Sequence, residues 1–315
     1  MADMIAPRDT WGLTIAELGK TNPDIVVLDA DLGPSTMVKH FAAAFPERFV
    51  EVGIAEANMI GIAAGLAASG KIPFASTFAA FASSRCFDQL RVSVAQSKLN
   101  VKVVATHAGV TVGEDGGSHQ ALEDLSLYCS LPNFTVIVPA DSVETASVIR
   151  AVTGHVGPCY VRLPRVKLPV INKPDYQFKL GEAAALRDGQ DVTIIAIGVL
   201  VSAALEAADN LAAEGISARV LNMASVKPID AAAVLSAAAE TGAIVTAEEH
   251  QEHGGLGSTV ARITAKNRPV PMEFVAVKDV FGMSGKPAEL LVRYGLTSPD
   301  IVKAVREVLK RKLSL

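Results

Sequence analysis

The sequence Glu51-Val-Gly-Ile-Ala-Glu56-Ala-Asn-Met-Ile-Gly61 predicts a short strand that turns through Gly53 into a helix. A strand that leads directly into a helix is the repeating unit of a parallel sheet. Through the first half of the chain, short β-branched runs alternate with longer Ala/Leu-rich stretches of helical period. We therefore expect an α/β fold with a doubly wound first domain. Its strands are predicted at Ile25–Leu28, Val101–His107, Thr135–Val138 and Cys159–Leu163, and its helices at Thr10–Lys20, Glu56–Ser69 and Ser142–Thr153.

A proline-rich stretch, Leu163–Gly181, lacks a clear period and is followed by a second alternation of strands and helices. We expect a first domain with a mostly parallel sheet over residues 1–170, a linker over 171–184, and a smaller Rossmann-like domain over 185–315. In the second domain, strands are predicted at Val192–Ile197, Ala218–Asn222 and Ala243–Ala247, and helices at Ser202–Glu214, Ala231–Thr241 and Pro299–Lys312.

The 315 residues carry a formal net charge of −4, and the basic residues are scattered through the chain. This distribution offers no footprint for nucleic acid or for an anionic membrane surface. The longest apolar run, near Val192–Leu205, is shorter than the roughly 18–20 residues of a membrane span. Met1–Asp9 shows no secretory signal, and the three cysteines lack metal-ligand spacing. We expect a cytoplasmic protein with reduced thiols that binds neither nucleic acid nor membrane.

Three short segments of the first domain carry groups that are suited to chemistry but have ordinary explanations. Glu56 opens a predicted helix, where a carboxylate is usually only a partner for the helix dipole. Phe78 and Phe81 lie three residues apart on one predicted helical face, where they either pack in the core or offer stacking faces to a planar ring. The segment Leu28–Ser35 holds Asp31 in an acidic turn, which an Asx turn before a helix explains equally well.

The loop Thr106–Gln120 is a stronger candidate for a site. It is rich in glycine and carries His107, Asp115 and His119 directly after a predicted strand. Ligands in open α/β sheets bind at the carboxyl ends of strands, so we favour a binding or catalytic role over a solvated loop. The spacing of these histidines and acids matches no standard set of metal ligands.

In chain order, these segments resemble the pyrimidine-binding domain of transketolases. The resemblance continues through the second domain and covers nearly the whole chain. The matching segments are Arg8, Ala30–Leu32, Ser35, Gly53–Glu56, Thr77–Phe81, Thr106–His107, Gly113–Gln120, Leu131–Asn133, Val138–Asp141, Val161–Pro164, Glu248–Gln251, Gly254–Gly255, Phe281–Gly285, Glu289–Leu291 and Tyr294–Leu296.

The resemblance implies a thiamine diphosphate enzyme. Glu56 would hydrogen-bond the aminopyrimidine ring of the cofactor and activate it. Phe78 and Phe81 would flank that ring, and the backbone near Ile54 would add a polar contact. Asp31 matches a position near the thiazolium ring and the subunit interface.

The resemblance also assigns a sugar site. His107 and His119 match catalytic positions that, together with Asp115, contact substrate hydroxyls or phosphate. The positions that hold the terminal phosphate match Arg8, Ser35 and Arg162, and arginine suits such anions. The implied reaction transfers a two-carbon ketol unit from a ketose phosphate to an aldose phosphate.

The Gly-Asp-Gly motif, through which transketolases hold the diphosphate by way of Mg²⁺ or Ca²⁺, does not occur in this sequence. In full-length transketolases the module that carries it lies on the N-terminal side. We therefore expect that module, with the metal ligands, on a separate N-terminal subunit, and no metal ligands on this chain. The expected assembly is a heterotetramer of two chains of each kind.

Several alternatives stay open. The β-subunit of a 2-oxo acid dehydrogenase decarboxylase has a similar length and an equivalent Glu, although His107 and the Gly113–Gln120 loop fit transketolases better. A 1-deoxyxylulose-5-phosphate synthase shares the Glu motif but is normally one long chain. Within the split group, the ketose could carry a sulfonate or a branched skeleton. A non-catalytic scaffold and a dinucleotide enzyme, the latter suggested by Gly255-Leu-Gly257, have weaker support.

Overall fold

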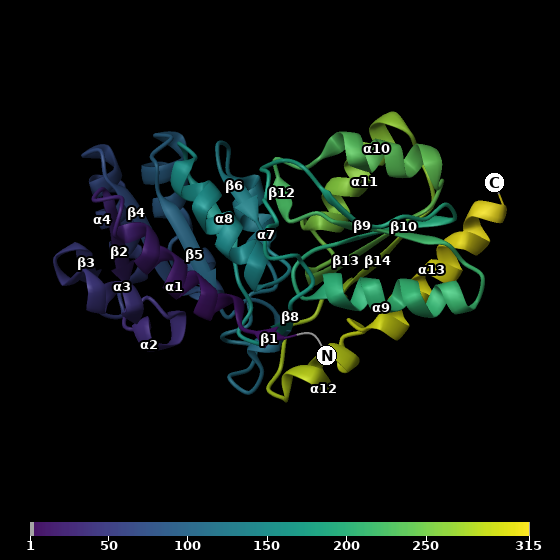
Figure 1. Cartoon of the computed structure of the whole chain (residues 1–315), viewed down its shortest axis with the longest axis horizontal. Coiled ribbons are helices and arrows are strands. Elements are labelled where there is room, and N and C mark those ends of the chain that lie inside the picture. Colours follow the sequence, from purple (N-terminus) through teal and green to yellow (C-terminus); the bar gives the residue numbers. More distant parts are fainter. Residues whose placement is uncertain (1–2, 315) are drawn as a thin grey trace.

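The computed structural model describes residues 3–314 as two α/β domains placed side by side (Figure 1). The first domain is built on a seven-stranded sheet with the order β12-β6-β7-β5-β4-β2-β3, in which only the pairing of β12 with β6 is antiparallel. This confirms the predicted fold class. The strands are β2 (Ile25–Asp29), β3 (Phe49–Glu51), β4 (Ile72–Phe78), β5 (Lys102–Thr106), β6 (Thr135–Ile137), β7 (Cys159–Arg162) and β12 (Ser225–Lys227).

The central strands of this sheet are buried along their whole length. Every residue of β2 and of β5 is buried, and both strands are rich in valine. Such continuous runs suit a parallel sheet that is covered on both faces, where no alternation with polar residues is needed. Parallel strands also bring their carboxyl ends to one edge, so the segments that follow β2, β4 and β5 meet there.

The helices of the first domain begin close to where the sequence predicts them. The helix expected from Thr10 begins earlier, at Pro7, because a proline is tolerated in the first helical turn. The helix beginning at Ser142 is capped by Asp141, whose carboxylate accepts the Glu144 N–H at 2.8 Å. The helices are α1 (Pro7–Gly19), α2 (Gly33–Thr36), α3 (Lys39–Ala44), α4 (Glu56–Ala68), α5 (Ala79–Ser84), α6 (Phe87–Gln89), α7 (Asp124–Ser130) and α8 (Ser142–Gly154).

The second domain has a five-stranded sheet with the order β14-β13-β10-β11-β9, in which β9 is antiparallel to β11. Figure 1 shows α9 and α13 on one side of this sheet and α10 and α11 on the other. The sequence predicted neither the edge strands nor α11 and α12. The elements are β9 (Ala184–Arg187), β10 (Val192–Ala196), β11 (Ala218–Asn222), β13 (Ile244–Gln251), β14 (Met272–Val277), α9 (Leu200–Ala213), α10 (Ala231–Glu240), α11 (Leu256–Asn267), α12 (Pro287–Arg293) and α13 (Ser298–Leu313).

The two domains are joined by more than the expected linker. Residues 171–183 contain no strand or helix, and a short ribbon of β1 (Met4–Ile5) with β8 (Leu168–Pro169) precedes them. In addition, β12 follows β11 in the chain and pairs with β6 of the first domain, so a segment beyond residue 185 adds a strand to the first sheet. This added strand supplies backbone hydrogen-bond partners to β6, which would otherwise be an open edge of the first sheet.

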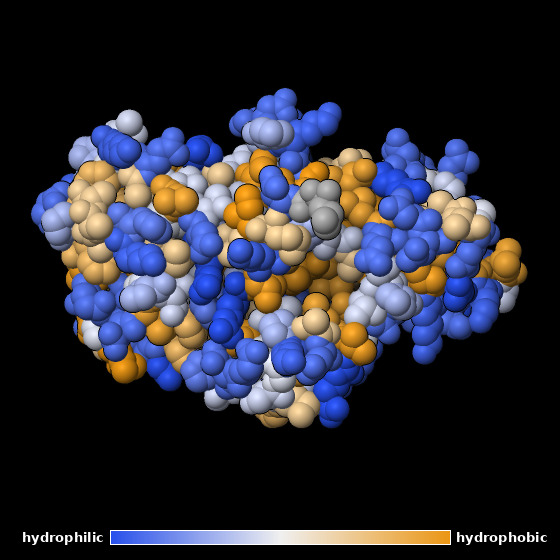
Figure 2. All heavy atoms as spheres, turned by 60° about the horizontal axis from the view of Figure 1, so that its bottom comes forward, coloured by the Kyte–Doolittle hydropathy of each residue, from blue (hydrophilic) through white to orange (hydrophobic). Residues whose placement is uncertain are grey.

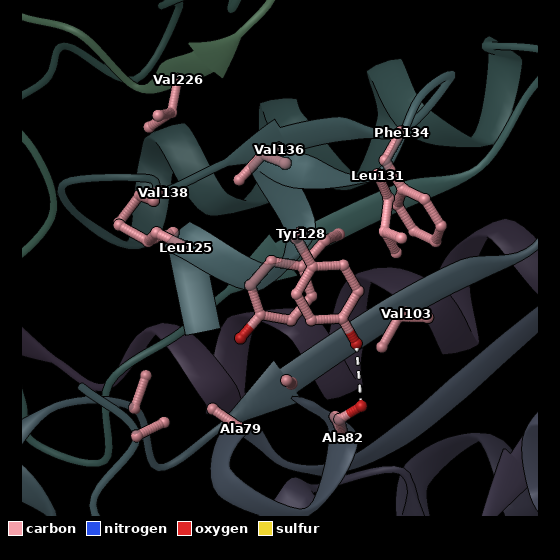
Figure 3. Packing of buried hydrophobic residues seen from close by; sticks show 14 of the residues in the cluster. Ala79, Ala82, Val103, Leu125, Tyr128, Leu131, Phe134, Val136, Val138 and Val226 are labelled. Carbon is pink, nitrogen blue, oxygen red and sulfur yellow. Dashed lines mark hydrogen bonds between the residues drawn. The ribbon is translucent and has the colours of Figure 1, made fainter. Parts of the chain in front are cut away.

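The core beneath the carboxyl edge is shared by several elements. Val226 of β12 belongs to the same hydrophobic cluster as Val136 and Val138, and Figure 3 shows these residues above the ring of Tyr128. The Tyr128 hydroxyl donates to the carbonyl oxygen of Ala82 at 3.1 Å (Figure 3). This bond ties α7 to α5, the helix that carries Phe81.

Two further expectations concern the chain as a whole. The three cysteines are unpaired, as expected for reduced thiols. Across residues 3–314, the structure has no helix that is both long enough and apolar enough to cross a lipid bilayer.

Candidate active site

The carboxyl edge of the first sheet gathers most of the predicted site residues. Strand pairing places Asp29 at the end of β2 beside Ser76 in β4, and Phe78 at the end of β4 beside Thr106 at the end of β5. The segments that follow these strands therefore leave the sheet next to one another, which is where open α/β sheets bind ligands.

Phe78 and Phe81 do not share a helical face, so that prediction is wrong. Phe78 is the last residue of β4, because its backbone still pairs with Thr106, and Phe81 lies in the first turn of α5. The two rings nevertheless stack, with centroids 5.7 Å apart and planes inclined by 19°. Phe78 also stacks on the imidazole of His107 at 3.8 Å and 22°. We call these three rings the aromatic wall.

Glu56 is joined to the aromatic wall through an arginine that sequence reasoning missed. Its carboxylate opens α4 and is only 4% exposed, and it accepts a hydrogen bond from Arg85 Nη1 at 2.5 Å. The guanidinium of Arg85 lies 4.0 Å from the centroid of the Phe81 ring, a cation–π distance. The available signal was the position of Arg85, four residues after Phe81 and therefore one helical turn further on.

His107 has a backbone conformation that is unusual for a residue with a side chain. Its φ is 56°, its side chain is buried, and its Nδ1 lies 2.8 Å from Thr106 Oγ1. Its Nε2 lies 3.3 Å from Arg8 Nη1, and Arg8 also donates to the Ser35 carbonyl oxygen at 3.0 Å. Left-handed histidines are uncommon, and such strain gathers at functional sites.

The charge state of His107 follows from its surroundings. Burial first, and then the positive charges of Arg8 and Arg165, together lower the pKa of His107 to about 3, so the ring is neutral at physiological pH. Arginine can only donate hydrogen bonds, so Nε2 is the acceptor and Nδ1 carries the proton toward Thr106.

The site loop, residues 107–120, also carries His119 and Asp115. His119 presents its ring edge to Phe81, with centroids 5.2 Å apart and planes inclined by 68°. A carboxylate oxygen of Asp115 lies 4.0 Å from Arg165 Nη1, and the same nitrogen donates to the Val112 carbonyl oxygen at 2.6 Å. Arg165 was not among the predicted residues, although it follows Arg162 by only three positions.

Arg162 does not lie where the resemblance places it, and its assignment to the substrate needs correction. Its side chain is 4% exposed and its Nε donates to Asp124 at 2.7 Å. Its Nη2 donates to the carbonyl oxygens of Ala121 and Glu249 at 3.1 and 2.9 Å. A guanidinium committed to internal partners in this way supports the fold, and Arg165 is the arginine that reaches the site.

Asp31 and Ile54 lie at the open side of the site. Asp31 is exposed with a φ of 61°, and its N–H donates to Glu51 Oε1 at 2.9 Å. Ile54 is 75% exposed. Both are therefore accessible to a ligand or to a second chain.

Part of α4 has no neighbour among the described residues. A methyl group added at Gly61 or Gly65 would meet no atom within 4 Å, and Asn58 on the same face is exposed. A helix face made of small residues lets another backbone approach closely. This face therefore has room for a second chain.

Two other features bear little on the chemistry. On the face shown in Figure 2, hydrophobic residues gather in a hollow. A cavity of about 560 Å³ is lined by residues of β8, α9 and α12 and by Thr111 of the site loop, but by no predicted site residue. Within residues 3–314, no cluster of three or more His, Cys, Asp or Glu side chains is arranged to hold a metal ion.

Comparison with known proteins assigns the family. The model of the transketolase pyrimidine-binding domain matches residues 3–170, and that of the transketolase C-terminal domain matches residues 181–301. The chain belongs to the transketolase family. It is 47% identical over 305 residues to the 6-deoxy-6-sulfo-D-fructose transketolase subunit SqwH of Clostridium sp. (strain MSTE9), covering 97% of this chain and 95% of that one.

Two further relatives have similar lengths. An apulose-4-phosphate transketolase subunit of Phocaeicola vulgatus is 38% identical, with coverage of 98% of this chain and 99% of the relative. A solved structure described as a split gene transketolase, inactive beta4 tetramer, superimposes with a TM-score of 0.92 at 51% identity, covering 98% of this chain and 99% of the other. Among transketolases, this chain thus resembles those encoded as separate subunits.

Proposed function

We propose that this chain is the pyrimidine-binding subunit of a two-chain transketolase that uses thiamine diphosphate. The observation that carries the proposal is the placement of Glu56, a nearly buried carboxylate at the start of α4, linked through Arg85 to the aromatic wall. A protonatable aminopyrimidine ring requires a buried carboxylate for its ring nitrogen and aromatic faces for stacking, and both are present here. The residues present therefore fit the cofactor.

The roles of the side chains follow from this placement. Glu56 would share a proton with a ring nitrogen of the pyrimidine, while Phe78 and Phe81 orient the ring and exclude water. Ile54 would offer its backbone, and the exposed Asp31 would face the remainder of the cofactor. When bound, thiamine diphosphate supplies the electron sink for cleavage of the carbon–carbon bond of a ketose.

The sugar would be held beyond the aromatic wall. Neutral His107, with His119 and Asp115 on the site loop, can exchange hydrogen bonds with sugar hydroxyls. Arg8 and Arg165 bring positive charge to the terminal anion, and Ser35 lies beside Arg8. The reaction is ketol transfer from a ketose phosphate to an aldose phosphate.

Related substrates remain within this proposal. The names of the two transketolase subunits compared above specify a sulfo sugar and a sugar phosphate. Because the planar guanidinium of arginine can donate to two oxygens of a tetrahedral oxyanion, phosphate and sulfonate both fit Arg8 and Arg165.

We also infer a separate partner chain that holds the diphosphate and its Mg²⁺ or Ca²⁺ ion. Support comes from the relatives that match this chain over nearly their whole length and are named as subunits. The unfilled face of α4 and the exposed Ile54 supply a surface for such a partner. The proposed assembly contains two chains of each kind.

The test is reconstitution. This chain and a candidate partner carrying the Gly-Asp-Gly motif would be purified separately, mixed with thiamine diphosphate and Mg²⁺, and assayed with a ketose phosphate donor and an aldose phosphate acceptor. We expect activity only from the mixture. In the mixture, Glu56→Gln should lower kcat by about 100-fold, because an amide cannot share the proton that general acid–base catalysis needs.

The matched control is Glu47→Gln, which changes an exposed carboxylate outside the site. It should leave kcat unchanged. Comparable activity from this chain alone would contradict the two-chain proposal, and unchanged turnover in the Glu56→Gln mixture would contradict the role of Glu56.

A further inference from the structure

The site loop is held largely by the second domain. Glu249, near the end of β13, accepts a hydrogen bond from the Thr111 backbone N–H through Oε1 at 2.6 Å. The same carboxylate lies flat against Gly109, where an added Cβ would be only 2.2 Å from the carboxyl carbon. Gly109 has a φ of 79°, so both its conformation and its contact with Glu249 require glycine.

A second segment of that domain closes on the far end of the site loop. Gln120 Nε2 donates to the Met283 carbonyl oxygen at 3.0 Å. A Cβ on Gly117 would be 2.6 Å from the Gly282 carbonyl oxygen, and one on Gly116 would be 2.5 Å from Ser284 Oγ. Both ends of the loop therefore pack closely against the second domain, with no space for side chains at these glycines.

Glu249 lies where burial of a carboxylate costs desolvation free energy. It is 1% exposed, and burial raises the pKa of Glu249 to about 7, with Arg162 and the Thr111 N–H acting in the opposite direction. Its Oε2 has no hydrogen-bond partner within the described residues. The nearby Arg162 is hydrogen-bonded to Asp124 and to the Glu249 backbone instead. A domain boundary built only for stability would favour an apolar side chain here.

We propose that Glu249 is a positioning residue for the active site, which fixes the backbone at Thr111 and thereby the histidines on either side of it. Thr111 lies four residues from His107 and eight from His119, and the loop between them is rich in glycine. Without an external anchor, such a segment samples many conformations. The second domain thus contributes to sugar recognition through the first. This inference rests on the proposed function only for the identity of the ligand.

The first experiment needs no activity. Hydrogen–deuterium exchange of the full chain would be followed in a peptide spanning residues 107–120. Glu249→Ala should accelerate exchange at Thr111 by about 10-fold or more, because its N–H loses its acceptor. Glu249→Gln keeps an acceptor oxygen and should restore most of the protection.

The matched control is Glu248→Ala on the same strand. Glu248 is also 1% exposed, but its carboxylate accepts the N–H groups of Leu256 and Gly257 at the start of α11, away from the site loop. This variant should lose comparable thermal stability and leave exchange at Thr111 unchanged. Equal acceleration in both alanine variants would overturn the proposal, since it would indicate general loosening of the domain.

The second experiment uses the enzyme assembled with its partner. Glu249→Ala should raise KM for the sugar phosphates by about 10-fold while leaving the affinity for thiamine diphosphate unchanged, because the loop faces the sugar and Glu56 faces the cofactor. Glu249→Gln should recover the wild-type KM. An unchanged sugar KM in Glu249→Ala, or an equal loss of cofactor affinity, would overturn it. An inactive wild-type mixture would instead contradict the proposed function, while the exchange experiment would still decide whether Glu249 anchors the loop.

Discussion

The two sheets place polar residues at the same topological position but use them differently. At the carboxyl edge of the first sheet, Phe78 and His107 border an open site whose neighbours, such as Asp31, are exposed. At the carboxyl edge of the second sheet, β13 carries Glu248, Glu249 and His250 just before its last residue, and each is no more than 1% exposed. The same architecture therefore produces an open edge, the proposed ligand-binding edge, in one domain and a docking edge in the other.

The docking edge is closed by direct contact between the domains. A Cβ on Gly198, which follows β10, would be 2.9 Å from a methyl group of Val138. His250 has Nδ1 2.7 Å from the Gln251 carbonyl oxygen, and its Nε2 accepts from the Ser126 N–H at 3.5 Å. Polar residues at strand ends thus identify an edge that meets something, and only the packing shows whether that is a ligand or another domain.

Two arginines separated by three positions offer the largest test of this comparison. Arg162 ends β7 of the first sheet but binds the docking edge through the Glu249 carbonyl oxygen. Arg162→Met should lower the free energy of unfolding by about 3–5 kcal/mol, because it leaves the buried Asp124 carboxylate uncompensated. Arg165 is 38% exposed at the site, so Arg165→Met should change stability by less than about 0.5 kcal/mol while raising KM for the sugar phosphates.

Urea titration and steady-state kinetics would measure the two effects. If Arg162→Met kept full stability and weakened sugar binding, the assignment of Arg162 to the substrate would be restored.

An intermediate effect is expected at Glu249. The pKa of Glu249 is raised to about 7 in the folded chain, so between about pH 4.5 and 7 the folded state binds a proton that the unfolded state has released. Stability from this group is therefore lost as the pH rises through that window. Glu249→Gln removes this titration. The free energy of unfolding of the variant, measured relative to that of the wild type, should therefore be roughly 2 kcal/mol higher at pH 8 than at pH 5.

Free energies of unfolding at the two pH values would give this difference. His107 titrates in both proteins, so its contribution cancels between variant and wild type. If the free energies of unfolding of Glu249→Gln and wild type differed by the same amount at pH 5 and pH 8, Glu249 would not be a buried titrating carboxylate.

The smallest expected effect is a change in the pKa of His107, at the proposed ligand-binding edge, when Arg8 is replaced. Burial is the main cause of the low pKa of His107, and the Arg8 charge is second, so Arg8→Met should raise that pKa only part of the way toward its usual value. The stability that His107 contributes is present above about pH 6.5 and is lost as the pH falls toward 3. An NMR titration of the histidine ring would report both proteins, and a fully restored pKa in Arg8→Met would show that charge, rather than burial, is the cause.

Much of the fold was predictable because its signals are local. The valine-rich runs at β2 and β5 and the alternation with Ala-rich helices predict a parallel sheet without any knowledge of contacts. The start of α4 at Glu56 was also found, since Gly53 and a first-turn carboxylate mark it. The helix predicted over Phe78 failed because pairing with β5 keeps that residue in a strand.

The sequence alone determined the fold class, the family resemblance and the set of polar residues at the strand ends, because these depend on period, composition and order. Tertiary structure alone decided which of those residues share a site. Arg85 reaches Glu56 across 29 positions, and Glu249 reaches Thr111 across 138. Arg162 and Arg165, alike in sequence, were separated only by burial. Burial and long-range contact arise from packing between elements, and no local pattern in the chain encodes them.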